Sequence, residues 1–499
     1  MGNCLGCPDR PPRKSGAPAL LTAADAELSA ASERLSADEG DTYWSESWTF
    51  FTNHQSLMWC YFFDGFEWYT YSYVVPYISV AVFQGHDTSA WLAWGVPFFI
   101  APIGGILFGH VGDFCGRKVS TVAAGCGLVV GTMGQGLTPV FSAWSVPWLL
   151  FFRAVQGISY GGKLSIGDVY LCEAAGPTIT AMSRVVAVIP WHMGFLALSL
   201  IVLPLEKALS LPQMQRWGWR IPFITSSLLS CVSLTYFAIH AKESPAFQKH
   251  LFNEVDELES KAQEDPDVVG QDATQNASVV PQNSVSTAAF VQRTWKQGVL
   301  LIGGMTMEFA YQALAYNFLK NWMSQYCGLS PLYAGVLNLG AQVLTMPGCI
   351  FGLYLADTIG LQMVGAMASG YGIILSLPLY LAPYSSPSNA FIVVGIESLG
   401  LGVMLSLTMC LKIWCCDLFP VEVRGRGTGL YTTIAFLNAG VAPAICTGYW
   451  LAPALYLLAA SGVSFVSFLL CILSHRNYAA EKGEDQFWVK VSYARDKLD

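Results

Sequence analysis

Charged side chains stand inside several long apolar runs of this chain, where they are candidates for chemistry. A charge at the centre of a bilayer costs roughly 2.5 to 3.5 kcal/mol on insertion scales, so a charged residue in a membrane-crossing run needs a reason to be there. The candidates fall in the first, fourth, seventh and tenth apolar runs and are Asp64, Glu67, Arg153, Lys163, Asp168, Glu308, Glu397 and Lys412.

The acids in these runs are predicted to carry protons. Asp64 and Glu67 are three residues apart, which places them on one face of a helix. A carboxyl group beside a second one, and partly removed from water, can hold a proton. We therefore predict proton coupling by Asp64, Glu67 and Glu308. A structural ion pair, for instance of Glu67 with Arg153 or Lys163, is the alternative.

The bases suit the binding of an anionic group. Arg153 can hold a carboxylate through two hydrogen bonds, and Lys163 and Lys412 add point charges. Lys163 has an alternative role, which is to neutralise an acid of the first run. The predicted polar contacts to a ligand, each of which can instead be a packing residue, are Tyr71, Tyr160, Tyr311 and Gln312. Lys320 is expected to reach toward the membrane surface.

The elements that position these residues are predicted to be membrane-spanning helices. Hydrophobic residues make up 53% of the 499 residues and charged residues 12%, against roughly 25% charged in a soluble protein. Each apolar run is long enough to cross about 30 Å of hydrocarbon as a helix. The runs are 57–83, 90–112, 119–137, 146–171, 185–206, 219–240, 298–320, 330–354, 362–383, 389–415, 427–450 and 451–474. We expect an all-α membrane protein with twelve spans.

The chain divides into two six-helix halves. We predict an N-terminal tail over 1–56, a first half over 57–240, an acidic cytoplasmic linker over 241–295, a second half over 296–474 and a C-terminal tail over 475–499. Lys and Arg concentrate on the side that holds both termini, which predicts that both termini are cytoplasmic. Two repeats of this kind can rock about a central site.

The loop 109–118, between the second and third runs, has a recognisable pattern. It is rich in glycine and carries one acid followed by two bases; its key residues are Gly112, Asp113, Gly116, Arg117 and Lys118. It resembles the loop between helices 2 and 3 of major facilitator superfamily transporters, which implies a conformational gate. Asp357, between the eighth and ninth runs, is a weaker echo that has lost both bases.

Further motifs resemble those of the metabolite:proton symporter family within that superfamily. They are Phe66-Glu67-Trp68-Tyr69, Arg153-Ala154-Val155-Gln156-Gly157, Trp217-Gly218-Trp219-Arg220, Glu243-Ser244-Pro245 and Leu418-Phe419-Pro420-Val421-Glu422-Val423-Arg424-Gly425. The last of these adds Arg424 to the expected gate. Known members carry proline and betaine, 2-oxoglutarate, shikimate or citrate with protons. The resemblance also implies that spans 1, 4, 7 and 10 line the central cavity.

This chain departs from the family pattern at three charged positions. Thr70 stands for an Asp, Ala101 for an Arg and Lys163 for a Glu. These changes leave two mechanisms open within transport, a proton symporter and a uniporter. The alternative outside transport is a membrane receptor or scaffold that moves no substrate.

The start of the chain resembles that of an acylated protein, with myristate on Gly2 and palmitate on Cys4 or Cys7. The fourteen cysteines show no metal-like spacing, so we expect no disulfide framework, no metal and no cofactor. No nucleophile or nucleotide motif predicts an enzyme.

The sequence thus predicts a secondary transporter for an organic anion or zwitterion. Its expected partners are the small-molecule substrate, protons and the lipid bilayer, with no nucleic acid. We expect a monomer in the plasma membrane, with an endomembrane as the alternative.

Overall fold

The computed structural model describes residues 42–175, 179, 181–249, 287–386, 419 and 423–482. The chain forms two compact units, one up to Phe50 and one from Phe51 onward. In the first unit the described residues are helical, and the Ser47 hydroxyl donates to the Tyr43 carbonyl at 2.8 Å. The second unit contains all of the candidate site that is described.

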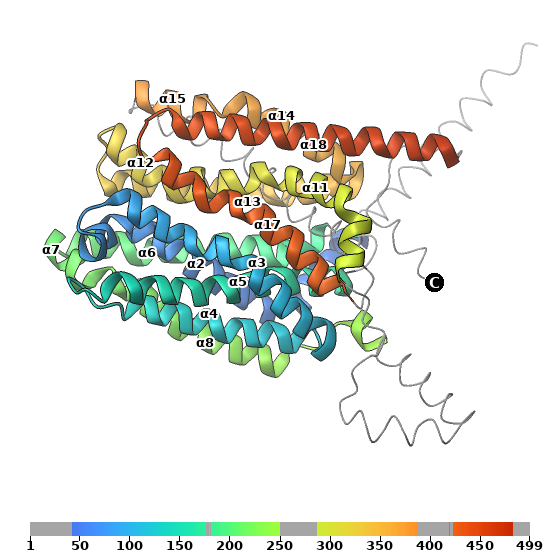
Figure 1. The fold of residues 1–499 in the computed structure, drawn as a ribbon, viewed down its shortest axis with the longest axis horizontal. Helices are drawn as coiled ribbons and strands as arrows, with labels where there is room; N and C mark the ends of the chain where they lie inside the picture. Colours follow the sequence, from blue (N-terminus) through green and yellow to red (C-terminus); the bar gives the residue numbers. More distant parts are fainter. Residues whose placement is uncertain are drawn as a thin grey trace, which may run out of the picture. The chain divides into compact units, whose positions relative to one another are not determined.

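Among the described residues, the N-terminal part of the second unit contains six long helices. They are α2 (Gln55–Phe83), α3 (Asp87–Cys115), α4 (Arg117–Gly136), α5 (Ser145–Ala174), α6 (Val185–Ala208) and α8 (Arg220–His240). Shorter helical segments join them: η1 (Met182–Arg184), α7 (Leu211–Gln213) and the π-helix η2 (Met214–Gly218). These helices are drawn in blue to green in Figure 1, where they run side by side.

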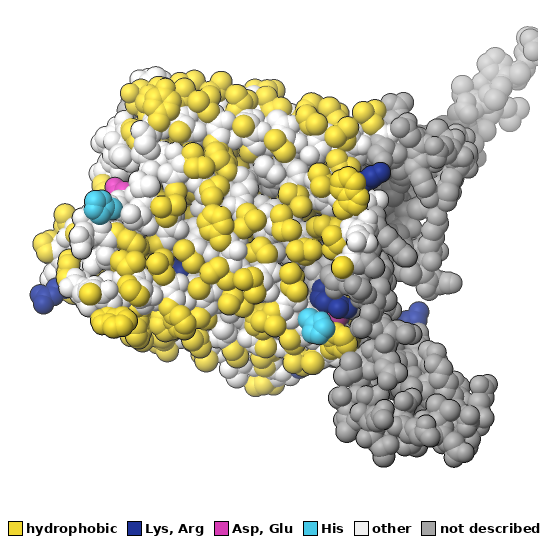
Figure 2. Space-filling model, in the orientation of Figure 1, with side chains coloured by type: hydrophobic (Ala, Val, Ile, Leu, Met, Phe, Trp, Pro, Cys, Tyr) yellow, Lys and Arg dark blue, Asp and Glu magenta, His cyan; other side chains and the backbone are white. Residues whose placement is uncertain are grey.

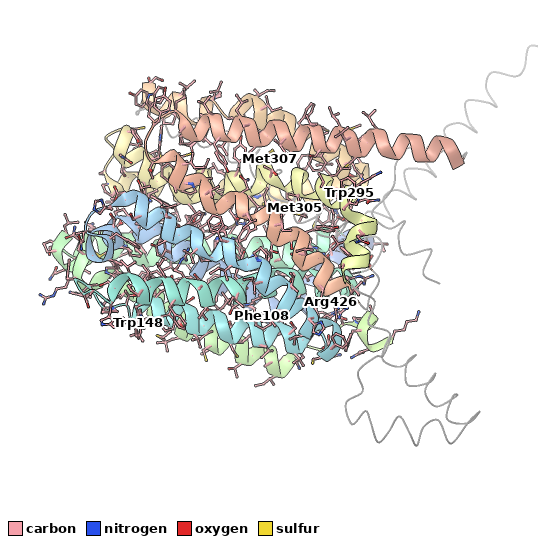
Figure 3. All side chains as sticks on the ribbon, viewed as in Figure 1. Phe108, Trp148, Trp295, Met305, Met307 and Arg426 are labelled. Atoms are coloured by element: carbon pink, nitrogen blue, oxygen red, sulfur yellow. The ribbon has the colours of Figure 1, made fainter. Side chains whose placement is uncertain are left out.

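The C-terminal part is drawn in yellow to red in Figure 1 and is again helical. Its described elements are α11 (Thr287–Tyr311), the π-helix η3 (Gln312–Phe318), α12 (Leu319–Tyr326), α13 (Pro331–Ile359), α14 (Leu361–Leu375), α15 (Pro378–Ser385), α17 (Arg424–Cys446) and α18 (Ala452–Lys482). Helix α11 begins within the range predicted as linker. Figure 3 shows that side chains fill the space between the helices, with Met305 and Met307 on α11.

Within the described residues, eight helices are long and apolar enough to cross a membrane. Helices α2, α4 and α5 are not among these eight, although they have 29, 20 and 30 residues. Their sequences contain aromatic, glycine and charged residues, which lower the mean hydropathy. The predicted tenth span, 389–415, lies outside the described residues. On the face drawn in Figure 2, hydrophobic side chains are spread over the described residues, as expected for contact with lipid.

Glycines let the two halves approach closely where α3 crosses α17. A Cβ atom at Gly105 would lie 2.7 Å from the carbonyl oxygen of Gly429, and one at Gly109 would lie 2.7 Å from that of Gly425. Any side chain there would therefore push the helices apart. This contact places the end of α3, which carries the loop 109–118, against the start of α17.

Candidate functional site

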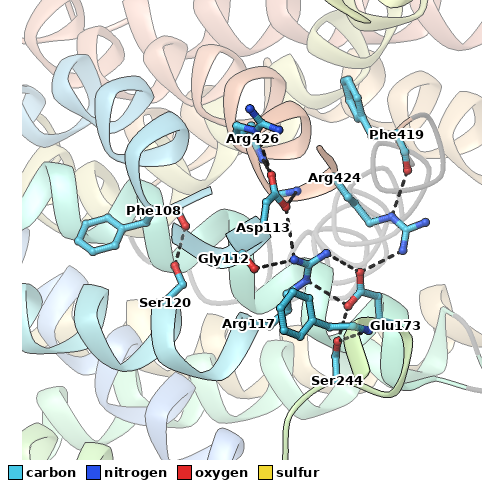
Figure 4. Close-up of polar contacts among 12 residues, drawn as sticks. Phe108, Gly112, Asp113, Arg117, Ser120, Glu173, Ser244, Phe419, Arg424 and Arg426 are labelled. Atoms are coloured by element: carbon cyan, nitrogen blue, oxygen red, sulfur yellow. Dashed lines mark hydrogen bonds and ion pairs between the residues drawn. The ribbon is translucent and has the colours of Figure 1, made fainter. Parts of the chain in front are cut away.

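Asp113 joins the two halves at the loop end of the bundle, which we define as the end that carries residues 109–118. Its carboxylate accepts from the backbone N–H groups of Gly425 at 2.9 Å and Arg426 at 3.2 Å. It also accepts from Arg426 Nε at 3.2 Å and Arg117 Nη1 at 3.4 Å (Figure 4). The N-terminus of α17 carries partial positive charge, so an anion is favoured at this position.

A second acid, Glu173 at the end of α5, holds two arginines. Arg117 donates to it through Nη2 at 3.0 Å and Nε at 3.2 Å, and Arg424 donates through Nη1 at 3.1 Å (Figure 4). The Ser244 hydroxyl donates to the same carboxylate at 2.5 Å. We call Asp113, Arg117, Glu173, Arg424 and Arg426 the loop-end gate. Glu173 was not predicted as a site residue; its one signal in the sequence is an acid just after the fourth apolar run.

The remaining loop residues shape the turn between α3 and α4. Gly116 has φ of +100°, which L side chains rarely adopt. The Glu243 carboxylate accepts from the backbone N–H groups of Arg117 at 2.9 Å and Lys118 at 3.1 Å. A Cβ at Gly112 would meet the Ile166 side chain. The gating role stays a prediction for all of the residues for which it was predicted, which are Gly112, Asp113, Gly116, Arg117, Lys118, Asp357 and Arg424.

Asp357 makes the matching contact from the other half of the chain. Its carboxylate accepts from the backbone N–H groups of Ala181 at 2.7 Å and Met182 at 2.9 Å. These groups lie at the start of η1, which leads into α6. Asp113 and Asp357 therefore each place a carboxylate on the N-terminus of a helical segment in the opposite half.

Another ion pair joins the halves at the far end of α6. Glu206 Oε1 lies 3.0 Å from Lys320 Nζ of α12 and accepts from the Tyr77 hydroxyl at 3.0 Å. The Lys320 ammonium also lies 4.0 Å from the centroid of the Tyr73 ring. Lys320 is only 2% exposed, so the expectation that it reaches the membrane surface is wrong. We call Glu206 and Lys320 the far-end pair.

The acids of the first span point into the N-terminal half. Asp64 Oδ1 lies 2.5 Å from Lys163 Nζ. The Glu67 carboxylate accepts from the Thr132 hydroxyl at 2.9 Å and from the Ser230 hydroxyl, which come from α4 and α8. A small cavity touches these groups and is lined by Asp64, Glu67, Gly125, Leu128, Val129, Lys163, Ser230, Ser233 and Leu234. We call Asp64, Glu67 and Lys163 the acid–base cluster.

Arg153 is bound by backbone carbonyls of α3. It donates through Nε to the Ala93 carbonyl at 3.2 Å, through Nη2 to the Trp94 carbonyl, and through Nη1 to Gln156 Oε1 at 2.8 Å. Its guanidinium lies 4.4 Å from the centroid of the Tyr71 ring, and the Tyr71 hydroxyl donates to the Ala90 carbonyl. This geometry places Arg153 between α5 and α3 and does not pair it with Glu67.

Polar and aromatic groups from both halves meet midway between the two ends. The Tyr69 hydroxyl accepts a hydrogen bond from Trp191 Nε1 at 3.2 Å. Glu308 of α11 is buried and lies four residues before Gln312. The π-helix η3 begins at Gln312, and such segments are frequent at functional sites.

The remaining candidate residues have different surroundings or lie outside the described residues. The Tyr311 hydroxyl donates to the Gly372 carbonyl at 3.0 Å, which ties α11 to α14. Asp168, in turn, forms an ion pair with Arg184 at 3.2 Å. Glu397 and Lys412 lie outside the described residues, as do the lipidation candidates Gly2, Cys4 and Cys7, and their roles stay predictions.

The chain also matches a known family. A family model described as the Major Facilitator Superfamily matches residues 57–443 of the chain. The chain belongs to the major facilitator superfamily. The all-α fold class with two six-helix halves is thereby confirmed, and membership in a superfamily of transporters agrees with the prediction that the protein is not an enzyme.

Transporters of small metabolites are among the similar proteins of this superfamily. The chain is 28% identical to the inner membrane metabolite transport protein YhjE of Escherichia coli K12, over 81% of this chain and 90% of the relative. It is 24% identical to the ectoine/proline transporter ProP of Corynebacterium glutamicum, over 81% of each chain. It is also 24% identical to the alpha-ketoglutarate permease of Escherichia coli K12, over 74% of this chain and 81% of the relative.

Solved structures of the superfamily share the fold. The proton:xylose symporter XylE bound to 6-bromo-6-deoxy-D-glucose aligns with a TM-score of 0.62 and 15% identity, over 91% of this chain and 99% of XylE. A partially occluded inward-open structure of XylE from E. coli aligns with a TM-score of 0.58. At this identity the likeness shows the fold alone. The protein is an integral membrane protein of the major facilitator superfamily.

Proposed function

We propose that this protein is a secondary transporter that moves a small organic anion or zwitterion by alternating access, together with protons. The main support for this proposal is that polar side chains connect the two halves at both ends of the bundle. The loop-end gate includes Asp113 bonded to Arg426, and the far-end pair joins Glu206 to Lys320. A carrier needs contacts of this kind that break in turn, one end at a time.

The acid–base cluster supports proton coupling. Its two carboxylates and one ammonium sum to a single negative charge when all are ionised, so one bound proton makes the cluster neutral. Protonation of Asp64 would end its ion pair with Lys163, which frees α2 to move relative to α5. A local charge change of this kind can shift the equilibrium between the two conformations of a carrier, one open at each end.

A uniporter is the second candidate. Thr70 occupies the position where the family has its coupling Asp, and its hydroxyl donates to the Phe66 carbonyl at 2.8 Å. This position therefore holds no group that titrates near neutral pH. The uniporter differs from the leading proposal only in that substrate flux is independent of the proton gradient.

The experiment is uptake into liposomes that contain the purified full-length protein and an internal pH dye. The panel contains proline, a betaine, 2-oxoglutarate and citrate as tracers. Symport predicts tracer uptake with internal acidification, and the variant Asp64→Asn should lose the acidification. Uptake without acidification in the wild-type protein would establish the uniporter. Binding without uptake of any compound would favour a receptor.

We further propose the cellular setting from the sequence pattern. The loop end faces the cytoplasm because it carries Arg117 and Lys118, so both termini are cytoplasmic. The protein resides as a monomer in the plasma membrane. We also propose the domain boundaries given above. In addition, we propose that the N-terminal tail is acylated at Gly2 and at Cys4 or Cys7.

A further inference from the structure

A chain of hydrogen-bonded side chains runs through the N-terminal half, from Arg153 of α5 to Glu67 of α2. Between them lie Gln156 of α5 and Thr132 of α4. None of the four is more than 2% exposed. All three helices belong to the N-terminal half, so these contacts are separate from the loop-end gate and the far-end pair. We call the four residues the polar chain.

The chemistry of Arg153 fixes the orientation of the Gln156 amide. A guanidinium has N–H donors and no acceptor, so the Gln156 atom that lies 2.8 Å from Arg153 Nη1 must be the carbonyl oxygen Oε1. Gln135 Nε2 donates to the same oxygen at 3.0 Å. The other end of the Gln156 amide is therefore its NH2 group, which can only donate, and it lies 3.4 Å from Thr132 Oγ1.

The direction of the last hydrogen bond follows from this orientation. Because the Thr132 hydroxyl accepts from Gln156, its single proton is left for Glu67 Oε2, which lies 2.9 Å away. The other carboxylate oxygen, Oε1, accepts from the Ser230 hydroxyl of α8. Among the described residues no donor fixes the Ser230 hydroxyl in the same way, so it can rotate and accept instead. The two oxygens of Glu67 are therefore not equivalent.

The cavity of the acid–base cluster lies on the Ser230 side of Glu67. Its lining includes Glu67, Ser230, Asp64 and Lys163, whereas Thr132 does not line it. Oε1 is thus the oxygen of Glu67 that a proton in the cavity would meet. A polar cavity of this kind also suits a water molecule, which needs two to four polar partners.

Few other titratable groups face Glu67 from the helices packed around α2. Helices α3, α4 and α8 carry their acids, bases and histidines near their ends. His192 of α6 is bonded to the Val188 carbonyl of its own helix at 2.7 Å. The Cys60 thiol, one turn before Asp64, donates to the Ser233 carbonyl at 3.8 Å. The charged groups next to Glu67 are therefore the other two members of the acid–base cluster.

We propose that Gln156 is a positioning residue for proton uptake, because through Thr132 it keeps Glu67 Oε2 as an acceptor and directs the proton to Oε1. When the proton arrives from the cavity, an O–H bond forms at Oε1 and the Ser230 hydroxyl turns to accept from it. The proton then passes across the cavity to the Asp64 carboxylate, which leaves Glu67 ionised and Asp64 neutral. This role rests on the proposed proton coupling and names the atom at which the proton enters the acid–base cluster.

Infrared difference spectroscopy of the purified full-length protein in liposomes tests this role without any substrate. Spectra are compared between acidic and alkaline buffer, and the C=O stretch of protonated Glu67 is the band that disappears in Glu67→Gln. If Oε2 is the carbonyl oxygen, Thr132→Val removes the hydrogen bond to it, and the band should shift to higher wavenumber. Gln156→Met leaves the Thr132 hydroxyl free to rotate, so a second band should appear at the shifted position.

Three further variants separate positioning from packing. Thr132→Ser keeps the hydroxyl and should keep the wild-type band. Ser230→Ala removes the partner of Oε1 and should shift the C=O band less than Thr132→Val does. Thr432→Val is the matched control, because Thr432 of α17 is also completely buried and its hydroxyl donates to the Thr428 carbonyl of its own helix at 2.7 Å. Thermal unfolding checks that each variant is folded.

Proton-coupled flux gives a second measurement. In liposomes with an internal pH dye, substrate-dependent acidification should fall about tenfold in Thr132→Val, because a hydrogen bond to a charged group is lost. It should recover in Thr132→Ser to within about threefold of the wild-type rate. The same loss in both variants would mean that the hydroxyl of Thr132 has no part in coupling.

The outcomes separate the role of Gln156 from transport. The absence of a titrating band that depends on Glu67, or an unchanged band in Thr132→Val or in Gln156→Met, overturns the positioning role. A larger shift in Ser230→Ala than in Thr132→Val would place the proton on Oε2 and overturn it as well. Flux with acidification but without these band shifts leaves the transport proposal standing. The expected shifts in a protein that shows no flux would support the positioning role and contradict transport.

Discussion

At the scale of single residues, an ion pair of the acid–base cluster holds two packed helices together. Asp64 and Lys163 come from α2 and α5 and form a close ion pair that is almost completely buried. Each charge stabilises the other in such a site, because the free-energy cost of burying a single charge is far larger than that of burying a pair. Under the proposed function, the pair stabilises the fold while Asp64 is ionised, and protonation of Asp64 would allow α2 to move relative to α5.

The first prediction concerns this pair. Lys163→Met leaves the Asp64 carboxylate buried without its partner and should destabilise the protein by about 3 kcal/mol. The double variant Asp64→Asn/Lys163→Met removes both charges and should recover more than half of that loss. Denaturant unfolding of the four proteins of this cycle measures the coupling. Additive effects of the two substitutions would show that the pair contributes nothing.

At the scale of elements, each polar contact between the two halves connects particular helices. The far-end pair connects α6 to α12, and the loop-end gate connects α3 and α5 to the start of α17. Glycines at the crossing of α3 and α17 make the second contact possible. A change at either place should therefore act on the movement of whole helices.

The second prediction tests the far-end pair by charge reversal. Glu206→Lys places two ammonium groups together and should hold this end open, which lowers uptake about tenfold or more. The exchanged variant Glu206→Lys/Lys320→Glu restores opposite charges and should recover uptake to within about threefold of the wild-type rate. Tracer uptake in liposomes is the measurement. Failure of the exchange to restore any uptake would mean that the pair does not act as a closing contact.

The third prediction concerns the helix crossing. Gly105→Leu adds a side chain where a Cβ would already lie 2.7 Å from the Gly429 carbonyl oxygen, so the loop end should no longer close. Uptake should fall at least about tenfold, since overpacking at a tight contact costs roughly 1 to 3 kcal/mol. Gly340→Leu is the control, because nothing lies within 4 Å of a Cβ there. Equal loss of uptake in both variants would contradict a specific role for the crossing.

Part of this site followed from the sequence for a physical reason. Apolar runs must be helices in lipid, and the loop 109–118 combines glycine, acid and bases at adjacent positions, so the fold and Asp113 and Arg117 were predictable. The residues that contact these side chains could not be predicted from the sequence. Glu173, Glu206 and the hydroxyls around Glu67 depend on helix rotation and on contacts between residues far apart in the chain. One sequence carries no record of such contacts.

At the scale of the whole molecule, the two halves of the chain are in contact at both ends of the bundle. The superfamily membership gives the architecture, and the residues of this chain give the contacts. The far-end pair and the loop-end gate are both formed in this structure. Transport then requires that they break in turn, in a cycle that returns each half to its starting position.

The fourth prediction belongs to the same scale and concerns the N-terminal tail. If Gly2 is myristoylated, expression in eukaryotic cells with labelled myristate should label the wild-type protein, and Gly2→Ala should abolish the label. Cys4→Ser/Cys7→Ser should keep the myristate label and lose labelled palmitate. Because the spans already anchor the protein, all variants should remain in the membrane fraction. A wild-type protein without either label would contradict the prediction.

Counterflow tests the alternating-access claim most directly. Liposomes that contain the full-length protein are loaded with a high concentration of unlabelled substrate, and a trace of labelled substrate is added outside. A carrier that alternates between its two ends predicts a transient accumulation of label above its equilibrium level, because internal substrate speeds the return of the binding site. A monotonic approach to equilibrium, with no overshoot, would contradict alternating access.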